Sequence, residues 1–179
     1  MQHGEKEACP GDPDLTARGR RQARRAAQML ALNGIDAIHA SPARRARQTA
    51  EIIAGGCGEL AVEVDERLRE RMNWTGEQPL PDFLAEWARA TADRDYQPAS
   101  GESSRRAGRR LVIYLDELCN IPITVAAATH GGVTVDLLRT LLGDSALPPA
   151  LLHGGVPPGA VTTLDGTRVI AIADVSHLR

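Results

Sequence analysis

Residues 123–132 read Ile-Thr-Val-Ala-Ala-Ala-Thr-His-Gly-Gly, an apolar run that leads directly into a histidine and two glycines. The run lacks the strict alternation of apolar and polar residues that is typical of a strand with one solvated face. It is therefore predicted to be a strand buried on both faces, as in a parallel sheet. Residues 133–142 are predicted to form a helix after it. This order places His130 at the carboxyl end of a central strand.

The rest of the chain also alternates between strand and helix patterns. Thr16 is a suitable N-cap for the first predicted helix. Helices are predicted at 17–32, from Ser41-Pro42 to about residue 53, at 82–91 and at 102–118, and strands at 37–40, 61–64, 160–164 and 169–174. Residues 148–159 carry several prolines and glycines and are predicted to be irregular. The alternation predicts an α/β fold, a three-layer α/β/α sandwich with a mostly parallel central sheet, in one domain covering residues 1–179.

Composition narrows the class of protein. A chain of 179 residues is long enough to bury a core, and with an aromatic content of only 3% that core must be aliphatic. The formal net charge of −2 argues against a general nucleic-acid binder. No apolar run approaches the roughly 20 residues that a membrane helix needs. Three dispersed cysteines without metal-binding spacing suit reduced thiols, so we expect a soluble, cytoplasmic protein.

Four short motifs contain the residue types that phosphate chemistry requires. They are Gln2-His3-Gly4-Glu5, Ser41-Pro42-Ala43-Arg44-Arg45-Ala46, Leu68-Arg69-Glu70 and Thr129-His130-Gly131-Gly132. In this order, with Leu15-Thr16-Ala17-Arg18-Gly19 between the first two, they resemble the histidine phosphatase superfamily, whose fold is phosphoglycerate mutase-like. The chain departs from that pattern at Gln2, where the signature has an arginine. The segment after Glu70 departs too, because it lacks a second glutamate.

The resemblance implies a role for each motif. His3 would be the nucleophile, with its other ring nitrogen held by an acceptor, for which we expect a backbone carbonyl. Glu70 would protonate the leaving oxygen and then activate water. Arg45 would clamp the phosphate through its planar guanidinium, and His130 would donate a hydrogen bond to the transferring group. The predicted catalytic residues are His3, Glu70, His130 and Arg45, the predicted phosphate-binding residues are Gln2, Gly4, Arg45, His130 and Gly131, and no metal or cofactor is expected.

Plainer interpretations stay open for several of these residues. His3 could be a mobile terminal histidine, Arg45 part of a surface ion pair, and Glu70 a surface carboxylate. The remaining histidines, at 39, 153 and 177, are interpreted as having no catalytic role, with His153 in a loop. Residues 49 and 50 are predicted to pack within their helix, Glu5 to be structural, and residues 101–103 to cap the helix that follows.

One element that the resemblance implies is missing. In the family an apolar strand precedes the Arg-His-Gly signature, whereas only Met1 and Gln2 precede His3 here. A sheet without that central strand would have unpaired backbone groups and an open apolar slot. Either a longer form of the chain supplies the strand or the protein folds without it, and we favour the first.

The function that we predict is a metal-independent phosphomonoesterase that acts through a phosphohistidine on a small phosphorylated substrate. We prefer a phosphatase to a mutase because the chain is compact and lacks substrate-gripping insertions. One alternative is a degenerate member that binds a phosphorylated ligand without turnover. The other is phosphoglycerate mutase-type phosphotransfer. No nucleic-acid or membrane partner is expected, and a homodimer stays open.

Overall fold

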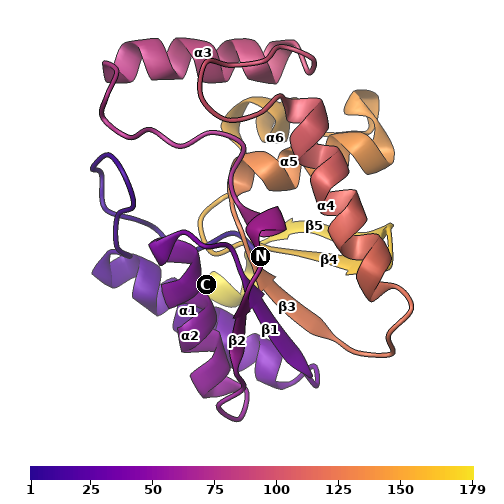
Figure 1. Cartoon of the computed structure of the whole chain (residues 1–179). Coiled ribbons are helices and arrows are strands. Elements are labelled where there is room, and N and C mark those ends of the chain that lie inside the picture. The colour runs from indigo at the N-terminus through magenta and orange to yellow at the C-terminus, as the bar shows by residue number, and fades with distance from the viewer.

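The computed structural model describes all residues, 1–179. Its main elements alternate between strands and helices, as the sequence predicts (Figure 1). The helices are α1 (Ala17–Ala31), α2 (Arg44–Gly56), α3 (Leu80–Ala92), α4 (Ser104–Leu118), α5 (Gly131–Leu142) and α6 (Pro149–Gly154), and the strands are β1 (Ala37–Ala40), β2 (Val62–Val64), β3 (Val125–Ala128), β4 (Val161–Asp165) and β5 (Arg168–Asp174).

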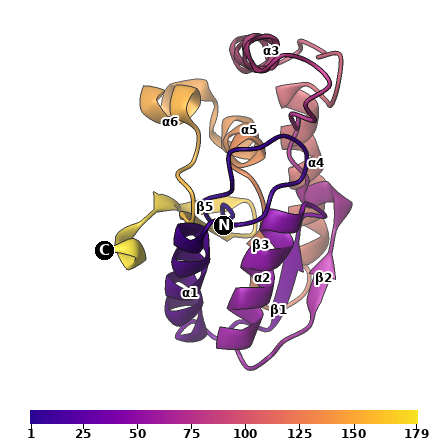
Figure 2. The same ribbon diagram turned by 90° about the vertical axis from the view of Figure 1, so that its left-hand side faces the viewer.

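The strands form a central layer between two layers of helices. β1 pairs in parallel with both β2 and β3, and β4 pairs with β5 in an antiparallel hairpin. α1 and α2 pack together on one face of the strands, while α4 and α5 pack together on the other (Figures 1 and 2). The predicted three-layer α/β/α fold with a mostly parallel sheet is therefore confirmed.

The predicted interruption of the sheet is also present, between β3 and β4. These strands belong to two separate sheets, and only the first residues of the chain bridge the distance between them. Gln2 forms a parallel bridge with Thr129 of the β3 side, and its backbone N–H donates to Ala160 on the β4 side. The amino group of Met1 donates to the carbonyl of Ala127. The chain thus begins in the middle of the sheet.

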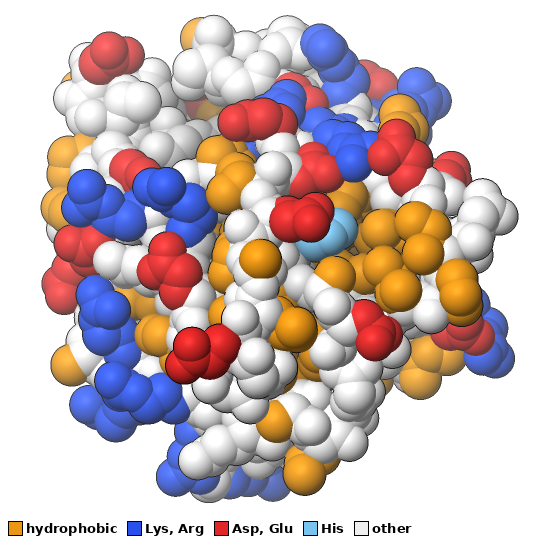
Figure 3. Space-filling model, turned by 60° about the horizontal axis from the view of Figure 1, so that its bottom comes forward, with side chains coloured by type: hydrophobic (Ala, Val, Ile, Leu, Met, Phe, Trp, Pro, Cys, Tyr) orange, Lys and Arg blue, Asp and Glu red, His pale blue; other side chains and the backbone are white.

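Beyond Met1 the interruption continues as an apolar slot of about 810 Å³. Its walls are formed by β3 and the chain that leads into it, by β4, and by side chains of α1 and α4 from the two helical layers. Figure 3 views the molecule from below and shows apolar side chains exposed between charged ones on this face. Ile121 and Ile123, which line the slot, are 49% and 39% exposed.

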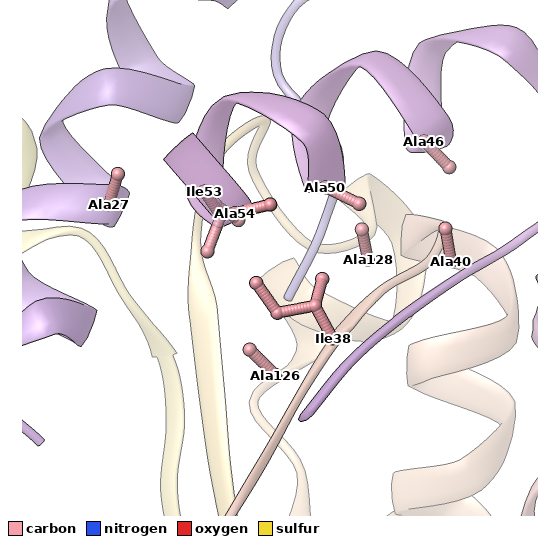
Figure 4. Packing of buried hydrophobic residues seen from close by; sticks show 9 residues of the cluster. All are labelled: Ala27, Ile38, Ala40, Ala46, Ala50, Ile53, Ala54, Ala126 and Ala128. Carbon is pink, nitrogen blue, oxygen red and sulfur yellow. The ribbon is translucent and has the colours of Figure 1, made fainter. Parts of the chain in front are cut away.

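The core between the sheet and α2 is aliphatic, as the composition predicts. Ile38 of β1 and Ile53 of α2 are its largest side chains, and alanines fill the space around them (Figure 4). Small side chains let α2 lie close to the strands, and this close packing sets the position of the first turn of α2 at the carboxyl ends of β1 and β3.

Two predicted elements differ from the observed ones. The helix predicted from residue 133 begins at Gly131, so its N-terminus lies directly beside His130. Residues 149–154, predicted to be irregular, form the short helix α6. Proline is tolerated in the first turn of a helix, where its missing N–H has no partner to lose, and Gly155 with φ of 73° ends it. No helix in the structure is both long and apolar enough to cross a membrane.

Candidate active site

The four motifs meet at the carboxyl edge of the parallel strands. Ser41 follows β1, His130 follows Thr129 at the end of β3, and His3 follows the bridge between Gln2 and Thr129. Adjacent parallel strands end at one edge of a sheet, which is where ligands bind in open α/β folds. The register of β1 and β3, which pairs Ala40 with Ala128, sets Ser41 beside the start of the His130 segment.

His3 is buried, with 6% of its surface exposed, and both ring nitrogens have partners. Nδ1 lies 2.7 Å from the carbonyl oxygen of Gly4, which can only accept. Arg45 donates through Nε to Nε2 at 3.2 Å, so Nε2 carries a lone pair and Nδ1 the proton. Burial lowers the pKa of His3 to about 4, assisted by the positive charges of Arg45 and Lys6, so the ring is neutral at pH 7. The backbone acceptor predicted for His3 is present.

Arg45, only 4% exposed, lies between the two histidines of the site. Its Nη2 lies 3.2 Å from Nδ1 of His130 and also donates to the Asn73 side chain at 3.2 Å. Its Nη1 is buried without a hydrogen-bond partner, and lies 3.6 Å from a carboxylate oxygen of Asp12. The geometry excludes the surface ion pair as an interpretation of Arg45. An unpartnered donor in this position is suited to an incoming anion.

His130 is almost completely buried, at 1% exposed. Its Nε2 lies 2.7 Å from the hydroxyl of Ser41, and the His3 and His130 ring centroids are 5.1 Å apart. Burial, followed by the positive charge of Arg45, holds the pKa of His130 well below its usual range. The sequence singled out His130 but assigned no role to Ser41.

Thr49 joins the His3 segment to the Arg45 helix. Its hydroxyl accepts from the backbone N–H of Gly4 at 3.1 Å and donates to the carbonyl of Arg45 at 2.8 Å. The sequence predicts only a packing role for Thr49. Gly4 is required for a reason that the sequence does not reveal, because a Cβ there would collide with the backbone of Gly19 in α1.

Gln2 lies where the resemblance places a phosphate-binding side chain. It is 8% exposed, and its Oε1 is buried without a partner. A Cβ on Gly131 would lie 2.6 Å from that oxygen, so the glycine lets the amide approach the first turn of α5. Two unpartnered polar atoms, one on Gln2 and one on Arg45, are therefore present at one sheet edge.

Glu70 lies against the N-terminus of α5. Its carboxylate accepts from the backbone N–H groups of Gly132 at 2.9 Å, Val133 at 2.8 Å and Arg71 at 2.9 Å. Burial raises the pKa of Glu70, although these hydrogen bonds and the charge of Arg71 act in the opposite direction. The carboxyl group makes no hydrogen bond to the histidines or to Arg45. The interpretation of Glu70 as a plain surface carboxylate does not fit these contacts.

Arg71, the neighbour of Glu70, is also held in place by side-chain contacts. Arg71 donates through Nη1 to both carboxylate oxygens of the buried Asp136 in α5, at 2.9 and 3.0 Å, and its guanidinium stacks on the Trp87 ring of α3. Asp136 also accepts from Ser104 at 2.6 Å. This network holds the Glu70 segment against α5.

The segment between residues 9 and 14 supplies two contacts that the sequence did not indicate. Both carboxylate oxygens of Asp12 accept from the backbone N–H of Arg44, at 2.8 and 3.0 Å. Asp12 thus caps the N-terminus of α2, where the sequence predicts favourable conditions for phosphate. Asn73 donates to the carbonyl of Gly11 at 2.7 Å, and because Asn73 also accepts from Arg45, it connects this segment to the Arg45 side chain. No sequence pattern marks a loop residue for such a contact.

Other candidates lie away from this edge or have structural contacts. His39 bonds the hydroxyl of Tyr114 at 2.8 Å, and His153 lies in α6 rather than in a loop. Glu5 accepts from the Thr16 hydroxyl at 2.9 Å, consistent with a structural role. Ser103 caps α4, as predicted. No group of three or more His, Cys, Asp or Glu residues is arranged to hold a metal ion.

Comparison with known proteins gives a family match over most of the chain. The model of the histidine phosphatase superfamily (branch 1) matches residues 2–168. The chain is 37% identical over 146 residues to the probable phosphoglycerate mutase GpmB of Yersinia enterocolitica, a match that covers 77% of this chain and 66% of that protein. The chain thus spans slightly less than two thirds of the length of this curated relative.

Two solved structures are similar over nearly the full length of both chains. One is a mycobacterial glucosyl-3-phosphoglycerate phosphatase in complex with inorganic phosphate, with a TM-score of 0.75, 25% identity and coverage of 99% of this chain and 97% of that chain. The other is YhfR of Bacillus stearothermophilus, with a TM-score of 0.74, 27% identity and coverage of 99% and 96%. The phosphoglycerate mutase-like fold is thereby confirmed.

Proposed function

Because this chain belongs to the histidine phosphatase superfamily, we propose that it is a metal-independent phosphomonoesterase that forms a phosphohistidine on His3. The observation that carries the proposal is the state of His3. Its proton is held on Nδ1 by the carbonyl of Gly4, so that Nε2 presents a lone pair toward Arg45. A neutral imidazole with a fixed tautomer and an adjacent guanidinium is what nucleophilic attack on a phosphoryl group needs.

The reaction would proceed in two displacements. In the first, Nε2 of His3 forms a bond to phosphorus, the bond from phosphorus to the ester oxygen breaks, and that oxygen takes a proton from Glu70. In the second, water gives a proton to Glu70 and forms a bond to phosphorus while the P–N bond breaks. The raised pKa of Glu70 supports the first role, since the acid must be protonated when the leaving group departs. Arg45 and His130 would hold the phosphoryl oxygens.

A second candidate, a protein that binds a phosphorylated ligand without turnover, is favoured by one observation. Arg45 is the only arginine among the proposed phosphate contacts, and a carboxylate oxygen of Asp12 lies 3.6 Å from its Nη1. Gln2 contributes a neutral amide instead of a second charge. Partial neutralisation of the one cation would weaken stabilisation of the transition state more than it weakens ground-state binding.

The test is hydrolysis of a generic aryl phosphate by the purified protein in the presence of a metal chelator. The wild type should turn over, His3→Ala should be inactive, and the wild type should form an acid-labile phosphoenzyme. His153→Ala is the matched control, because that histidine is exposed in α6 and lies outside the candidate site. Turnover that persists in His3→Ala contradicts the mechanism. Phosphate binding by an inactive wild type would favour the non-catalytic candidate.

A further inference from the structure

His130 is held at both ring nitrogens, and the two partners differ in what they can donate. A guanidinium only donates, so the contact of 3.2 Å from Arg45 Nη2 leaves Nδ1 with a lone pair. The proton of the neutral ring is then on Nε2, which donates to the Ser41 hydroxyl at 2.7 Å. The nitrogen that faces the Arg45 guanidinium, where we propose that phosphate binds, is therefore the one without a proton.

Ser41 is placed to accept this proton by the strands themselves. It is completely buried, directly after β1, and its backbone N–H donates to the carbonyl of Ala128 at 2.9 Å. The paired strands therefore fix the distance between the hydroxyl and the His130 ring. The hydroxyl oxygen has two lone pairs, so it can accept from His130 while its own proton points elsewhere.

The lone pair on Nδ1 of His130 opposes the binding of an anion beside it. A phosphate oxygen placed against Nδ1 would meet a lone pair in a buried site, which is unfavourable unless a proton lies between the two atoms. Phosphate monoesters have a second pKa near 6, so near neutral pH the required proton is available from the phosphate monoanion or from water.

We propose that Ser41 is a positioning residue that accepts the Nε2 proton of His130 and stabilises the imidazolium formed when a phosphoryl group binds at Nδ1, so that phosphate and one proton are taken up together. In the monoanion, the O–H bond of phosphate breaks and an N–H bond forms at Nδ1. The products are a phosphate dianion and an imidazolium whose Nε2–H still donates to Ser41. The proposal rests on the proposed function only in requiring that phosphate binds at this site.

The charges around His130 agree with such a change on binding. Arg45 from α2, His3 from the first residues of the chain and Arg110 from α4 all oppose a positive charge on the free ring. On the α5 side, the Glu70 carboxyl group accepts from Gly132, two residues after His130. A phosphate dianion adds two negative charges among these groups, which favours the imidazolium once the site is occupied.

Calorimetry with inorganic phosphate tests the proposal without any need for turnover. Titrations at about pH 8.5, where inorganic phosphate is almost entirely the dianion, in buffers of different ionisation enthalpy give the number of protons taken up. We expect uptake approaching one proton for the wild type and for Ser41→Thr, which keeps the hydroxyl. In Ser41→Ala the imidazolium has no acceptor for its Nε2–H, and because a charged donor makes a stronger hydrogen bond than a neutral one, uptake should fall by more than half.

Two controls separate proton positioning from a loss of structure. Ser103→Ala removes another buried serine hydroxyl, at the cap of α4, and should lower stability without changing proton uptake. His130→Gln should abolish uptake, which identifies this ring, rather than His3, as the group that gains the proton. Equal uptake by the wild type and Ser41→Ala, or no uptake by the wild type, would overturn the proposal.

The tautomer can also be read without phosphate. Long-range ¹H–¹⁵N spectra should show the proton on Nε2 of His130 in the wild type, with Nδ1 accepting from Arg45. A proton on Nδ1 of His130 in the free wild type contradicts the proposal even if phosphate does not bind. Conversely, if the protein takes up a proton with phosphate but never hydrolyses an ester, the role proposed for Ser41 is supported and the proposed function is contradicted.

Discussion

The rings of His3 and His130 lie 5.1 Å apart and carry their protons on opposite nitrogens. In His3 the proton is on Nδ1, facing a backbone carbonyl, and in His130 it is on Nε2, facing the Ser41 hydroxyl. Both rings therefore present a lone pair to one guanidinium, that of Arg45. The candidate site is organised around a single cation, and a phosphate that binds there as we propose would replace these two contacts.

The low pKa values of the two histidines predict a pH dependence of stability. The pKa of His3 is lowered from 6.5 to about 4, and that of His130 also lies well below 6.5. At pH values between about 6.5 and 4, the histidines of the unfolded chain bind protons that His3 and His130 of the native protein do not. The free energy of unfolding should therefore fall as the pH falls from about 7 toward 4. The slope should reach roughly 1 kcal/mol per pH unit for each ring.

Urea unfolding at a series of pH values measures this slope. His130→Gln should flatten it, because one of the two rings no longer titrates. The exposed His153 supplies the matched control, and His153→Gln should leave the slope unchanged. An unfolding free energy in the wild type that does not vary between pH 7 and about pH 5 would show that neither ring is held neutral by the fold.

Gln2→Arg should increase catalysis if the site is otherwise complete. The side chain at this position is buried beside Gly131, and an arginine there would add a second charge and a bidentate donor. A charged contact to the transition state is typically worth a few kcal/mol, so we expect kcat/KM to rise by about a hundredfold.

The matched variant is Gln2→Met, which keeps the length of the side chain but removes the amide donors. It should lower kcat/KM below the wild-type value. If Gln2→Arg tightens phosphate binding but produces no increase in turnover, the non-catalytic candidate is favoured. If it changes neither, Gln2 does not contact phosphate.

Thr49→Val should damage the site while preserving the shape of the core. The substitution leaves the N–H of Gly4 and the carbonyl of Arg45 without their shared partner. An unsatisfied buried group costs about 1–3 kcal/mol, and the His3 segment would lose its hydrogen bond to α2. We expect lower stability together with a loss of kcat of tenfold or more, measured against Thr49→Ser, which retains the hydroxyl and should remain close to the wild type.

The sequence was sufficient to predict the order of elements and the aliphatic core, which follow from composition and from patterns within single segments, such as the apolar run before His130. That the four motifs form one site was implied by the resemblance to a known family. The contacts that orient the reactive groups are different, because each joins segments far apart in the chain. Ser41 meets His130 only through the register of β1 and β3, and Thr49 of α2 meets Gly4 only because the first residues of the chain lie beside α2.

The same reasoning explains the loop contacts that were missed. Asp12 and Asn73 are ordinary polar residues in segments without periodic pattern, and either could have faced solvent. Their roles depend on how residues 9–14 fold back over the first turn of α2. The sequence gives the chemistry that a residue can supply, but the tertiary fold decides which of these residues supply it.

The slot between β3 and β4 predicts that the protein can be stabilised by adding chain at its start. Met1 lies at the top of the slot, where burial lowers the pKa of its amine to about 6, and the slot continues along β3 in the direction from which an added segment would come. Four apolar β-branched residues placed before Met1 would span about 13 Å, pair with β3 in parallel and be buried on both faces. They would also replace a buried amine by a neutral amide.

We expect this extension to raise the free energy of unfolding by about 2–5 kcal/mol in urea titrations, as the balance of apolar burial and the entropy of ordering four residues. The β3 amides that face the slot should become protected from hydrogen exchange. An extension of the same length made of glycine and serine is the control, because it can pair with β3 but cannot fill an apolar slot. Equal stabilisation by both extensions, or by neither, would mean that the slot does not accept a strand.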